Sequence, residues 1–153
     1  MRLIKSSLAT LATMATLGAL SSSAVAQAKS EPEWDKVLKD GNHLLAIGET
    51  ERAISSFEAK TKKYPESGAC HTALGRALKR LGRLDQAKLE FRRATEVEPG
   101  YADGFYELGV IQESDKEWGA AAEAFKRYVE LKPESAQRKT LEERILYCNS
   151  QKE

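Results

Sequence analysis

A period of 34 residues runs through this sequence and constrains its fold more than any other feature. Pro65, Pro99 and Pro133 follow one another at that interval. Three further sets share the spacing: Gly41, Gly75 and Gly109; Ala53, Ala87 and Ala121; and Phe57, Phe91 and Phe125. Self-similarity at a fixed period of about 20–50 residues is typical of proteins built from stacked repeats. The sequence therefore predicts three repeats, over residues 34–67, 68–101 and 102–135.

Each repeat has the pattern of two helices joined by a short turn. In the second repeat, residues 69–81 and 84–97 both carry apolar side chains at helical spacing. Pro99 ends the second of these stretches, because proline lacks an N–H and disfavours helix at the residue before it. The residues at the break between the two helices are Gly48, Gly82 and Lys116. The turn is therefore signalled less strongly in the third repeat.

The periodic glycines lie in the middle of the first helices, where glycine costs about 1 kcal/mol relative to alanine. We expect the missing side chain to let the second helix approach closely, with Ala53, Ala87 and Ala121 as its contacts. The periodic phenylalanines are then expected to fill the wider space toward the next repeat. A single hairpin cannot bury both of its faces, so stacking of the three supplies the core.

The periodic residues resemble the tetratricopeptide repeat, as seen in Phe105, Leu108, Gly109, Ala121, Phe125 and Pro133 of the third repeat. The resemblance covers residues 34–135 and implies an all-α fold, a right-handed α-solenoid of three helical hairpins. Repeat one departs from the pattern at Val37, and at Asp40 where the other repeats have Leu74 and Leu108. We expect the outer edge of repeat one to be looser or more solvated.

A capping helix is predicted after the third repeat, over residues 136–148. Leu141, Ile145 and Leu146 lie on one face of this segment and charged residues lie elsewhere. Repeat arrays need a polar outer face at their ends for solubility. Residues 149–153 are expected to fray.

Residues 1–28 have the pattern of a cleaved signal peptide. Arg2 and Lys5 precede an uncharged run over residues 8–20, and small residues follow it. A helix of about 13 residues spans only ~20 Å, short of the ~30 Å hydrocarbon core, which argues against a membrane anchor. The mature chain is expected to begin at Gln27 or Lys29, with residues up to 33 as a short lead-in. The protein is therefore predicted to be exported, to a Gram-negative-type periplasm in the first place, with secretion as the alternative.

Catalytic or cofactor chemistry finds little support in the sequence. His43 and His71 are the two histidines, and no third residue stands at metal-ligand spacing. His71 lies on the apolar stripe of its helix and is interpreted as a packed core histidine. Cys70 and His71 are adjacent, so their side chains point about 100° apart and do not face each other as a nucleophile and its base would. With 24 basic and 23 acidic residues, the chain also lacks the basic excess of a nucleic-acid-binding protein. We expect no enzyme activity, no cofactor and no metal.

The two cysteines pose a conflict between compartment and geometry. Export favours a disulfide between Cys70 and Cys148. The predicted elements place them several helices apart, well beyond the ~4.4–6.8 Å between Cα atoms that a disulfide needs. We therefore predict no disulfide, with Cys70 partly shielded and Cys148, near the fraying end, the more reactive thiol.

The family resemblance implies that the first helices line a concave groove for a peptide or protein segment. The groove residues it implies are Leu38, Asn42, Leu45, Thr72, Arg76, Lys79, Arg80, Tyr106, Val110 and Glu113, flanked by Asp35, Ala69 and Asp103. One subgroup of the family clamps the acidic tails of cytosolic chaperones with Lys, Asn, Asn, Lys and Arg. The corresponding residues here are Leu38, Asn42, Ala73, Asp103 and Glu107, of which only Asn42 agrees. Binding of chaperone tails is therefore not expected.

The basic residues Arg76, Lys79 and Arg80 allow two interpretations. They form either a solvated face neutralised by neighbouring acids or a specificity element for an acidic segment. In both cases the sequence favours a non-enzymatic adaptor that binds a protein or peptide segment. The alternative is a structural protein that associates with itself end to end, and a thiol-dependent enzyme is a distant third.

Overall fold

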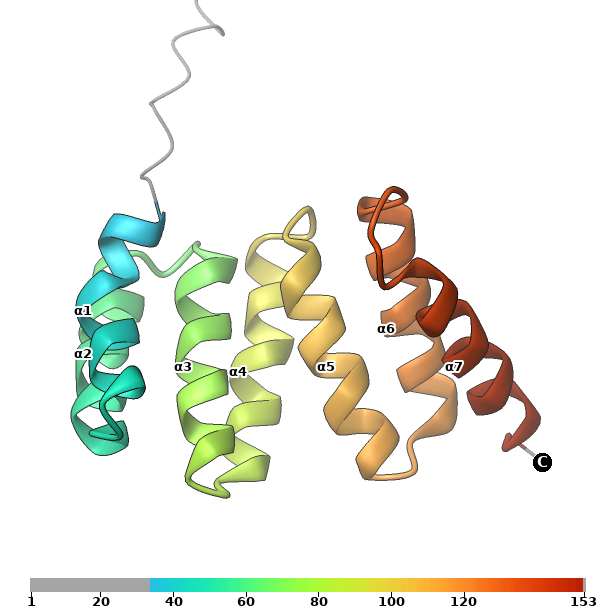
Figure 1. The fold of residues 1–153 in the computed structure, drawn as a ribbon, viewed down its shortest axis with the longest axis horizontal. Helices are drawn as coiled ribbons and strands as arrows, with labels where there is room; N and C mark the ends of the chain where they lie inside the picture. The colour runs from blue at the N-terminus through green and yellow to red at the C-terminus, as the bar shows by residue number, and fades with distance from the viewer. Residues whose placement is uncertain (1–33, 153) are drawn as a thin grey trace, which may run out of the picture. The chain divides into compact units, whose positions relative to one another are not determined.

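The first helices of the three repeats begin at Trp34, Gly68 and Ala102, 34 residues apart. The computed structural model describes residues 34–152 of the chain, so the predicted signal peptide and lead-in lie outside the described residues. This part of the chain contains seven α-helices and no strand (Figure 1). The helices are α1 (Trp34–Ala46), α2 (Thr50–Lys63), α3 (Gly68–Arg80), α4 (Leu84–Val97), α5 (Ala102–Ser114), α6 (Trp118–Leu131) and α7 (Arg138–Ser150). The all-α class is confirmed.

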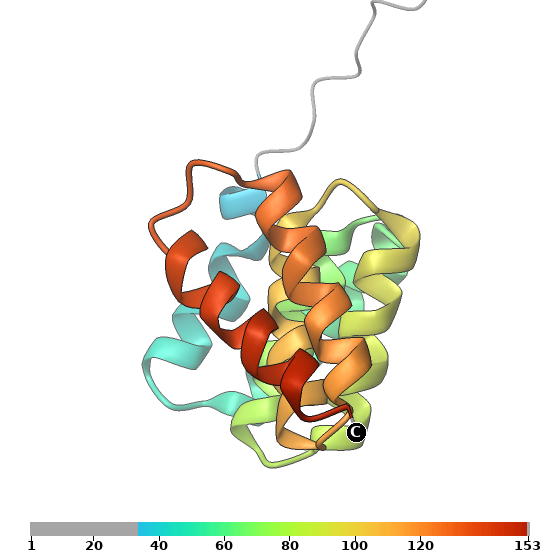
Figure 2. The same ribbon diagram turned by 90° about the vertical axis from the view of Figure 1, so that its right-hand side faces the viewer.

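The helices pack as hairpins stacked in chain order. Helices α1 and α2, α3 and α4, and α5 and α6 pair within repeats, while α2 contacts α3, α4 contacts α5, and α6 contacts α7. The first helices also touch one another, α1 with α3 and α3 with α5. Figure 2 looks along the array from its C-terminal end, where α7 covers α6. The result is the predicted α-solenoid of helical hairpins.

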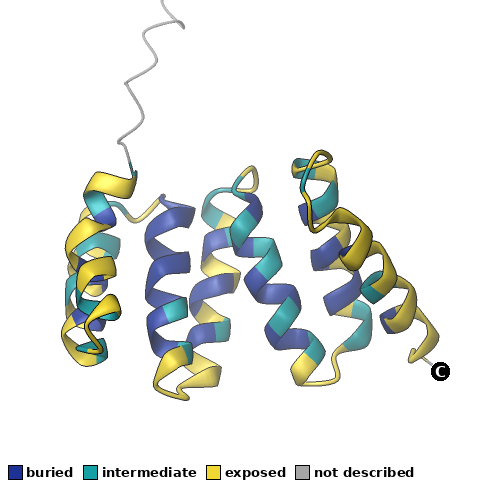
Figure 3. Ribbon diagram, viewed as in Figure 1, coloured by how far each residue is buried: buried dark blue, intermediate teal, exposed yellow. Residues whose placement is uncertain are grey.

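Burial is deepest in the middle of the array. Figure 3 shows α3 buried along most of its length, whereas the helices at the two ends expose their outer sides. In α1, Asp40 is exposed at the position where Leu74 and Leu108 of the other repeats are buried. The more solvated edge expected for repeat one is therefore confirmed.

The periodic glycines make room for the periodic phenylalanines of the same hairpin, not for alanines. A Cβ atom placed on Gly75 would lie 2.5 Å from Cε1 of Phe91, and on Gly109 it would lie 2.6 Å from Cε1 of Phe125. All three rings are fully buried. The expectation that an alanine is the nearest contact of each glycine was wrong. The Phe125 ring does reach beyond its own hairpin, since the Arg144 guanidinium of α7 lies 4.3 Å from its centroid. A phenylalanine ring is larger than the methyl group of alanine, so it fills more of the space that the glycine leaves.

The turn inside each hairpin places one residue in the left-handed region. Gly48 has φ 84°, Gly82 has φ 74° and Lys116 has φ 61°. The left-handed conformation costs a non-glycine residue about 1–2 kcal/mol, because its Cβ crowds the carbonyl oxygen. The third repeat therefore makes the same turn as the others, with strain at Lys116.

We expect Lys116→Gly to raise the free energy of unfolding by about 1 kcal/mol, since glycine removes the steric cost of the left-handed conformation. Urea unfolding followed by circular dichroism measures the change. Lys126→Gly is the matched control, because Lys126 is an exposed residue within α6, and glycine there should cost about 1 kcal/mol. A loss of stability for Lys116→Gly would contradict the strain assigned to this turn.

The capping helix differs from its prediction in bounds and in register. Helix α7 runs from Arg138 to Ser150, two residues later than predicted, so Asn149 and Ser150 are helical and not frayed. Its inner face carries Leu141, half-buried Ile145 and Cys148, at spacings of four and three. Leu146 is one step of about 100° away from Ile145 and is 70% exposed. The assignment of Leu146 to the inner face was therefore wrong.

Both cysteines are free and fully buried, Cys70 in a core cluster with residues of all three repeats and Cys148 on the inner side of α7. The expectation that Cys148 would be the more exposed and reactive thiol was wrong, because the register of α7 turns it inward. Burial raises the pKa of both thiols, and Glu113 raises that of Cys148 further. Both effects keep the unreactive thiol form.

We expect both thiols to react slowly with a neutral thiol reagent in the folded protein and at the full rate in denaturant. An opening cost of about 3 kcal/mol for either site would slow the reaction roughly a hundredfold. The measurement is absorbance after mixing with the reagent at pH 8, with and without urea. One equivalent of thiol that reacts at the denatured rate would contradict the burial of that cysteine.

Candidate binding groove

A pocket opens between the first helices of the three repeats. Its volume is about 320 Å³, near the lower end of the ~300–1,000 Å³ typical of ligand pockets. Four residues implied by the family resemblance line it, namely Leu38, Asn42, Leu45 and Arg76. Asp35, Ala69 and Asp103 lie there as well. Residues far apart in the sequence therefore meet because α1, α3 and α5 lie side by side.

Thr72, Lys79 and Arg80 do not line this pocket. Thr72 is fully buried, and its hydroxyl has no hydrogen-bond partner in the described part of the chain. Its oxygen lies between helices, 3.5 Å from the position that a Cβ on Gly104 would take. Lys79 is half-buried and binds Glu107, while Arg80 is exposed at the end of α3. The three residues therefore have different surroundings: Thr72 lies in the core, Lys79 forms an ion pair and Arg80 faces solvent.

The groove residues implied on α5 lie against the third hairpin and the cap. Tyr106 packs against the rings of Phe125 and Tyr128, with ring centroids 6.5 and 5.5 Å apart. Val110 packs on the same buried cluster. Glu113 pairs with Arg144 of α7, through both guanidinium Nε and a second nitrogen. The Glu113 carboxylate, which the prediction assigned to a ligand, is therefore bound by the capping helix instead.

Two aromatic residues line the pocket that the sequence interpretation did not include, Trp34 and Tyr101. Trp34 meets Tyr64 edge to face with ring centroids 5.7 Å apart. Tyr101 stands just before α5, at the position held in the other repeats by Ser67 and Ser135. Ser67 caps α3 by accepting the Cys70 N–H, whereas Tyr101 makes no such bond. The tyrosine in place of the periodic serine was the sequence signal that could have identified Tyr101 as a lining residue.

Burial, followed by the nearby carboxylate of Asp103, raises the pKa of Tyr101 to about 12. The Tyr101 hydroxyl therefore keeps its proton at neutral pH and can donate it in a hydrogen bond. No hydrogen bond of this hydroxyl to another residue of 34–152 is seen, and the same holds for the Asn42 amide. The pocket thus combines apolar side chains with the polar groups of Tyr101 and Asn42, which have no hydrogen-bond partner among residues 34–152.

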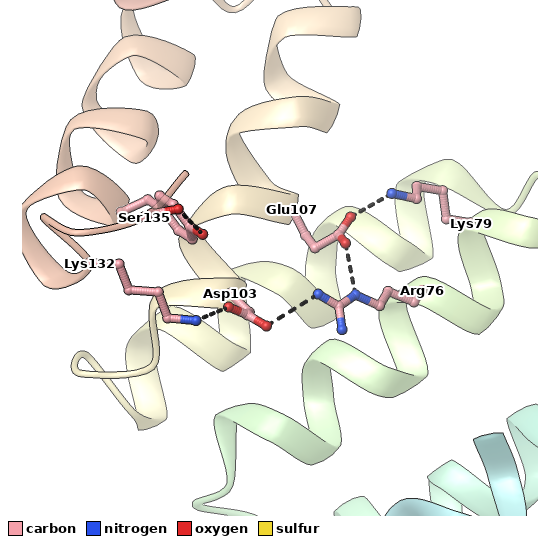
Figure 4. Close-up of polar contacts among 7 residues, drawn as sticks. Arg76, Lys79, Asp103, Glu107, Lys132 and Ser135 are labelled. Carbon is pink, nitrogen blue, oxygen red and sulfur yellow. Dashed lines mark hydrogen bonds and ion pairs between the residues drawn. The ribbon is translucent and has the colours of Figure 1, made fainter. Parts of the chain in front are cut away.

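Figure 4 shows a series of ion pairs that includes two residues of the pocket lining, Arg76 and Asp103. Lys132 Nζ lies 2.7 Å from Asp103, whose other oxygen is 3.5 Å from Arg76. Arg76 Nε donates to Glu107 at 2.7 Å, and Lys79 Nζ donates to the second Glu107 oxygen at 2.5 Å. Arg76 and Lys79 are therefore neutralised by acids of the next repeat, which is the first of the two interpretations offered for the basic residues.

The ion pairs in this series keep their members in the charged form. Glu107 is buried, so its carboxylate depends on the two cations beside it. Burial alone would lower the pKa of Arg76, but the hydrogen bond and charge of Glu107 outweigh that effect and raise it. Arg80 is the remaining basic residue, and within residues 34–152 it forms no ion pair.

Metal sites and membrane-spanning helices are two other kinds of functional feature. Among residues 34–152, no three His, Cys, Asp or Glu side chains are grouped so that they could hold a metal ion. Within the same residues, no helix combines the length and apolar character needed to cross a membrane.

Comparison with known proteins places these features in context. The tetratricopeptide repeat model matches residues 38–87 and 72–136. Protein CTR9 homolog of Arabidopsis thaliana is 34% identical over 86 residues, which are 56% of this chain and 8% of that protein. The chain therefore spans a small part of the length of this curated relative.

Solved structures share the fold at low sequence identity. The TPR2B domain of yeast Sti1, in a complex with pHsp70, is 16% identical with a TM-score of 0.67, covering 78% of this chain and 98% of that one. The first TPR of Spaghetti (RPAP3), bound to the HSP90 peptide SRMEEVD, is 17% identical with a TM-score of 0.67, covering 76% and 93%. At these identities the likeness concerns the fold.

Proposed function

Because the chain belongs to the tetratricopeptide repeat family, we propose that it is a non-enzymatic scaffold that holds a protein or peptide segment between α1, α3 and α5. The observation that carries this proposal is the pocket of about 320 Å³, which gathers residues from all three repeats. Concave pockets with an apolar lining and a few polar groups are the usual form of binding sites. Solved structures of the same fold include a complex with pHsp70 and a domain bound to an HSP90 peptide, which supports this kind of partner.

The proposed setting is the cell envelope. It depends on the signal-peptide pattern of residues 1–28, in which Arg2 and Lys5 precede an uncharged run. A scaffold exported to the periplasm would meet exported proteins or the periplasmic segments of membrane proteins. Mass spectrometry of the protein recovered from periplasmic extract tests the setting. We expect a first residue of Gln27 or Lys29, and recovery of the intact chain from the cytoplasm alone would contradict it.

Blocking the pocket tests the binding function. Ala73 is 7% exposed and lies on the pocket wall, so Ala73→Leu places a larger side chain in the binding space. Asn42→Arg does the same from an exposed position on α1. We expect both variants to lose the proteins that the wild type captures from envelope extracts. Ala120→Leu, at an exposed position on α6, is the control that should capture normally.

Thermal unfolding of each variant separates loss of binding from loss of folding. Capture that is unchanged in Ala73→Leu and in Asn42→Arg, both folded, would overturn the proposed use of this pocket. The partner would then have to bind another face of the array.

Self-association is the second candidate, and one observation favours it. Leu146 and Tyr147 on α7 are 70% and 52% exposed, at the end of the array. Large apolar side chains that remain exposed together can mark an interaction surface. Light scattering over a concentration series distinguishes the two candidates, because the scaffold is expected to stay monomeric. A mass that rises with concentration and falls on Leu146→Glu would favour end-to-end stacking.

A further inference from the structure

Resting on the function proposed above, we propose that the pocket selects a segment in which one large apolar side chain stands beside a basic residue, and not an acidic tail. Three features of the lining carry this inference. They are the apolar residues of the lining, the internal pairing of the basic residues, and one acidic group that has no ion pair within residues 34–152.

Part of the pocket lining is apolar. It consists of Ala69 and Ala73 of α3 and of Leu38 and Leu45 of α1. The small alanines leave space that a guest side chain can fill. Removing apolar surface from water contributes roughly 25 cal/mol per Å², so a leucine or phenylalanine side chain of the partner would gain most by entering here.

The cations along the pocket are already paired. Arg76 is held by Glu107 and Asp103, and Lys79 is held by Glu107. An acidic ligand would have to compete with these carboxylates for the same two cations, and drawing the cations away would leave buried Glu107 unpaired. Leaving a buried charge unpaired is among the most costly changes in a protein. An acidic partner is therefore disfavoured, although the sequence alone allowed it.

Asp35 is the charged lining residue that has no ion pair within residues 34–152. It lies in the first turn of α1 and is exposed, where its charge also suits the N-terminus of a helix. Trp34 and Tyr101 line the pocket with it. Aromatic faces attract cations, so this end of the pocket favours a lysine or arginine of the partner.

The test is selection from a library of random nine-residue peptides on the immobilised full chain, with Ala73→Leu used to discard peptides that bind elsewhere. We expect enrichment of a large apolar residue followed or preceded closely by Arg or Lys. For a selected peptide, Asp35→Asn should weaken binding about two- to fivefold, the effect of an exposed charge pair. Asp40→Asn is the matched control, because Asp40 is an exposed acid of α1 that does not line the pocket.

The outcomes separate this inference from the function on which it rests. Peptides that bind wild type and not Ala73→Leu, but are acidic or lack a large apolar residue, would overturn the inference and leave the scaffold function standing. Equal effects of Asp35→Asn and Asp40→Asn would overturn the role of Asp35. If no enriched peptide is sensitive to Ala73→Leu, both the inference and the use of this pocket are wrong.

Discussion

Replacing Phe91 by alanine is expected to lower the free energy of unfolding by about 3–5 kcal/mol, the usual cost of emptying a buried aromatic site. Phe91 is fully buried in the central hairpin, and its ring lies against the α-carbon of Gly75. Glycine provides no side chain that could move into the vacated space. The cavity can therefore close only if α3 and α4 move together, which their contacts with α2 and α5 oppose.

Urea unfolding monitored by circular dichroism measures this loss. Leu89→Ala is the matched control, since Leu89 lies on the same helix but is 46% exposed. A loss below about 1 kcal/mol for Phe91→Ala would place the ring outside the core, since exposed sites usually change stability within ~0.5 kcal/mol.

A double-mutant cycle tests the pairing with Gly75 directly. In the wild type, a methyl group at residue 75 would collide with the Phe91 ring, whose nearest atom would lie 2.5 Å away. Gly75→Ala should therefore destabilise the wild type, yet stabilise the Phe91→Ala variant by filling part of its cavity. Additive effects of the two substitutions would show that the residues do not share this space.

The sequence predicted the helices well because the 34-residue period repeats the same local signals three times. Their starts at Gly68 and Ala102 and the turns at Gly48 and Gly82 follow from those signals. The contacts between helices were harder to predict. A period shows that glycine and phenylalanine recur together, but it does not say whether the ring fills the glycine gap or an alanine does.

The pocket was predicted in part, for a similar reason. The family resemblance implied Leu38, Asn42 and Leu45 as groove residues of α1, and all three line the pocket. The pairing of Arg76 with Glu107 joins residues 31 positions apart, and that of Glu113 with Arg144 likewise. Such pairs depend on how far neighbouring hairpins are rotated against each other, which no local pattern specifies.

The second large effect concerns His71, which the sequence placed in the core and the structure buries beside Glu90. Its Nδ1 lies 2.7 Å from Glu90 Oε2, and its Nε2 lies 3.0 Å from the Pro65 carbonyl oxygen. A carbonyl oxygen and an ionised carboxylate only accept hydrogen bonds, so this geometry suits an imidazole with a proton on both nitrogens. The geometry therefore favours the charged imidazolium.

The hydrogen bond to Glu90 is the main cause of a raised pKa for His71, and it outweighs the burial that would lower the pKa. Arg93 binds the other Glu90 oxygen at 2.7 Å and opposes the shift slightly. A histidine with a raised folded pKa stabilises the protein fully below its unfolded pKa of 6.5. The contribution disappears as the pH rises from 6.5 through the higher folded pKa.

Glu90→Ala is expected to cost about 3 kcal/mol at pH 6, because it leaves a buried imidazolium without its counter-charge. Glu90→Gln keeps an acceptor for His71 and should cost less. Glu96→Ala, at an exposed position on the same helix, is the control and should change stability little. Urea unfolding at several pH values between 6 and 9 provides the comparison.

The dependence on pH identifies the cause of this loss. In the wild type, stability should fall as the pH rises above 6.5, because His71 gives up a proton that its two acceptors require. In Glu90→Gln the carboxylate that raises the folded pKa is gone, so this fall should still begin near pH 6.5 but end at lower pH and be smaller. A constant difference between the two proteins from pH 6 to 9 would mean that Glu90 acts through packing and Arg93 alone, and that His71 is neutral in the folded protein despite facing two acceptors.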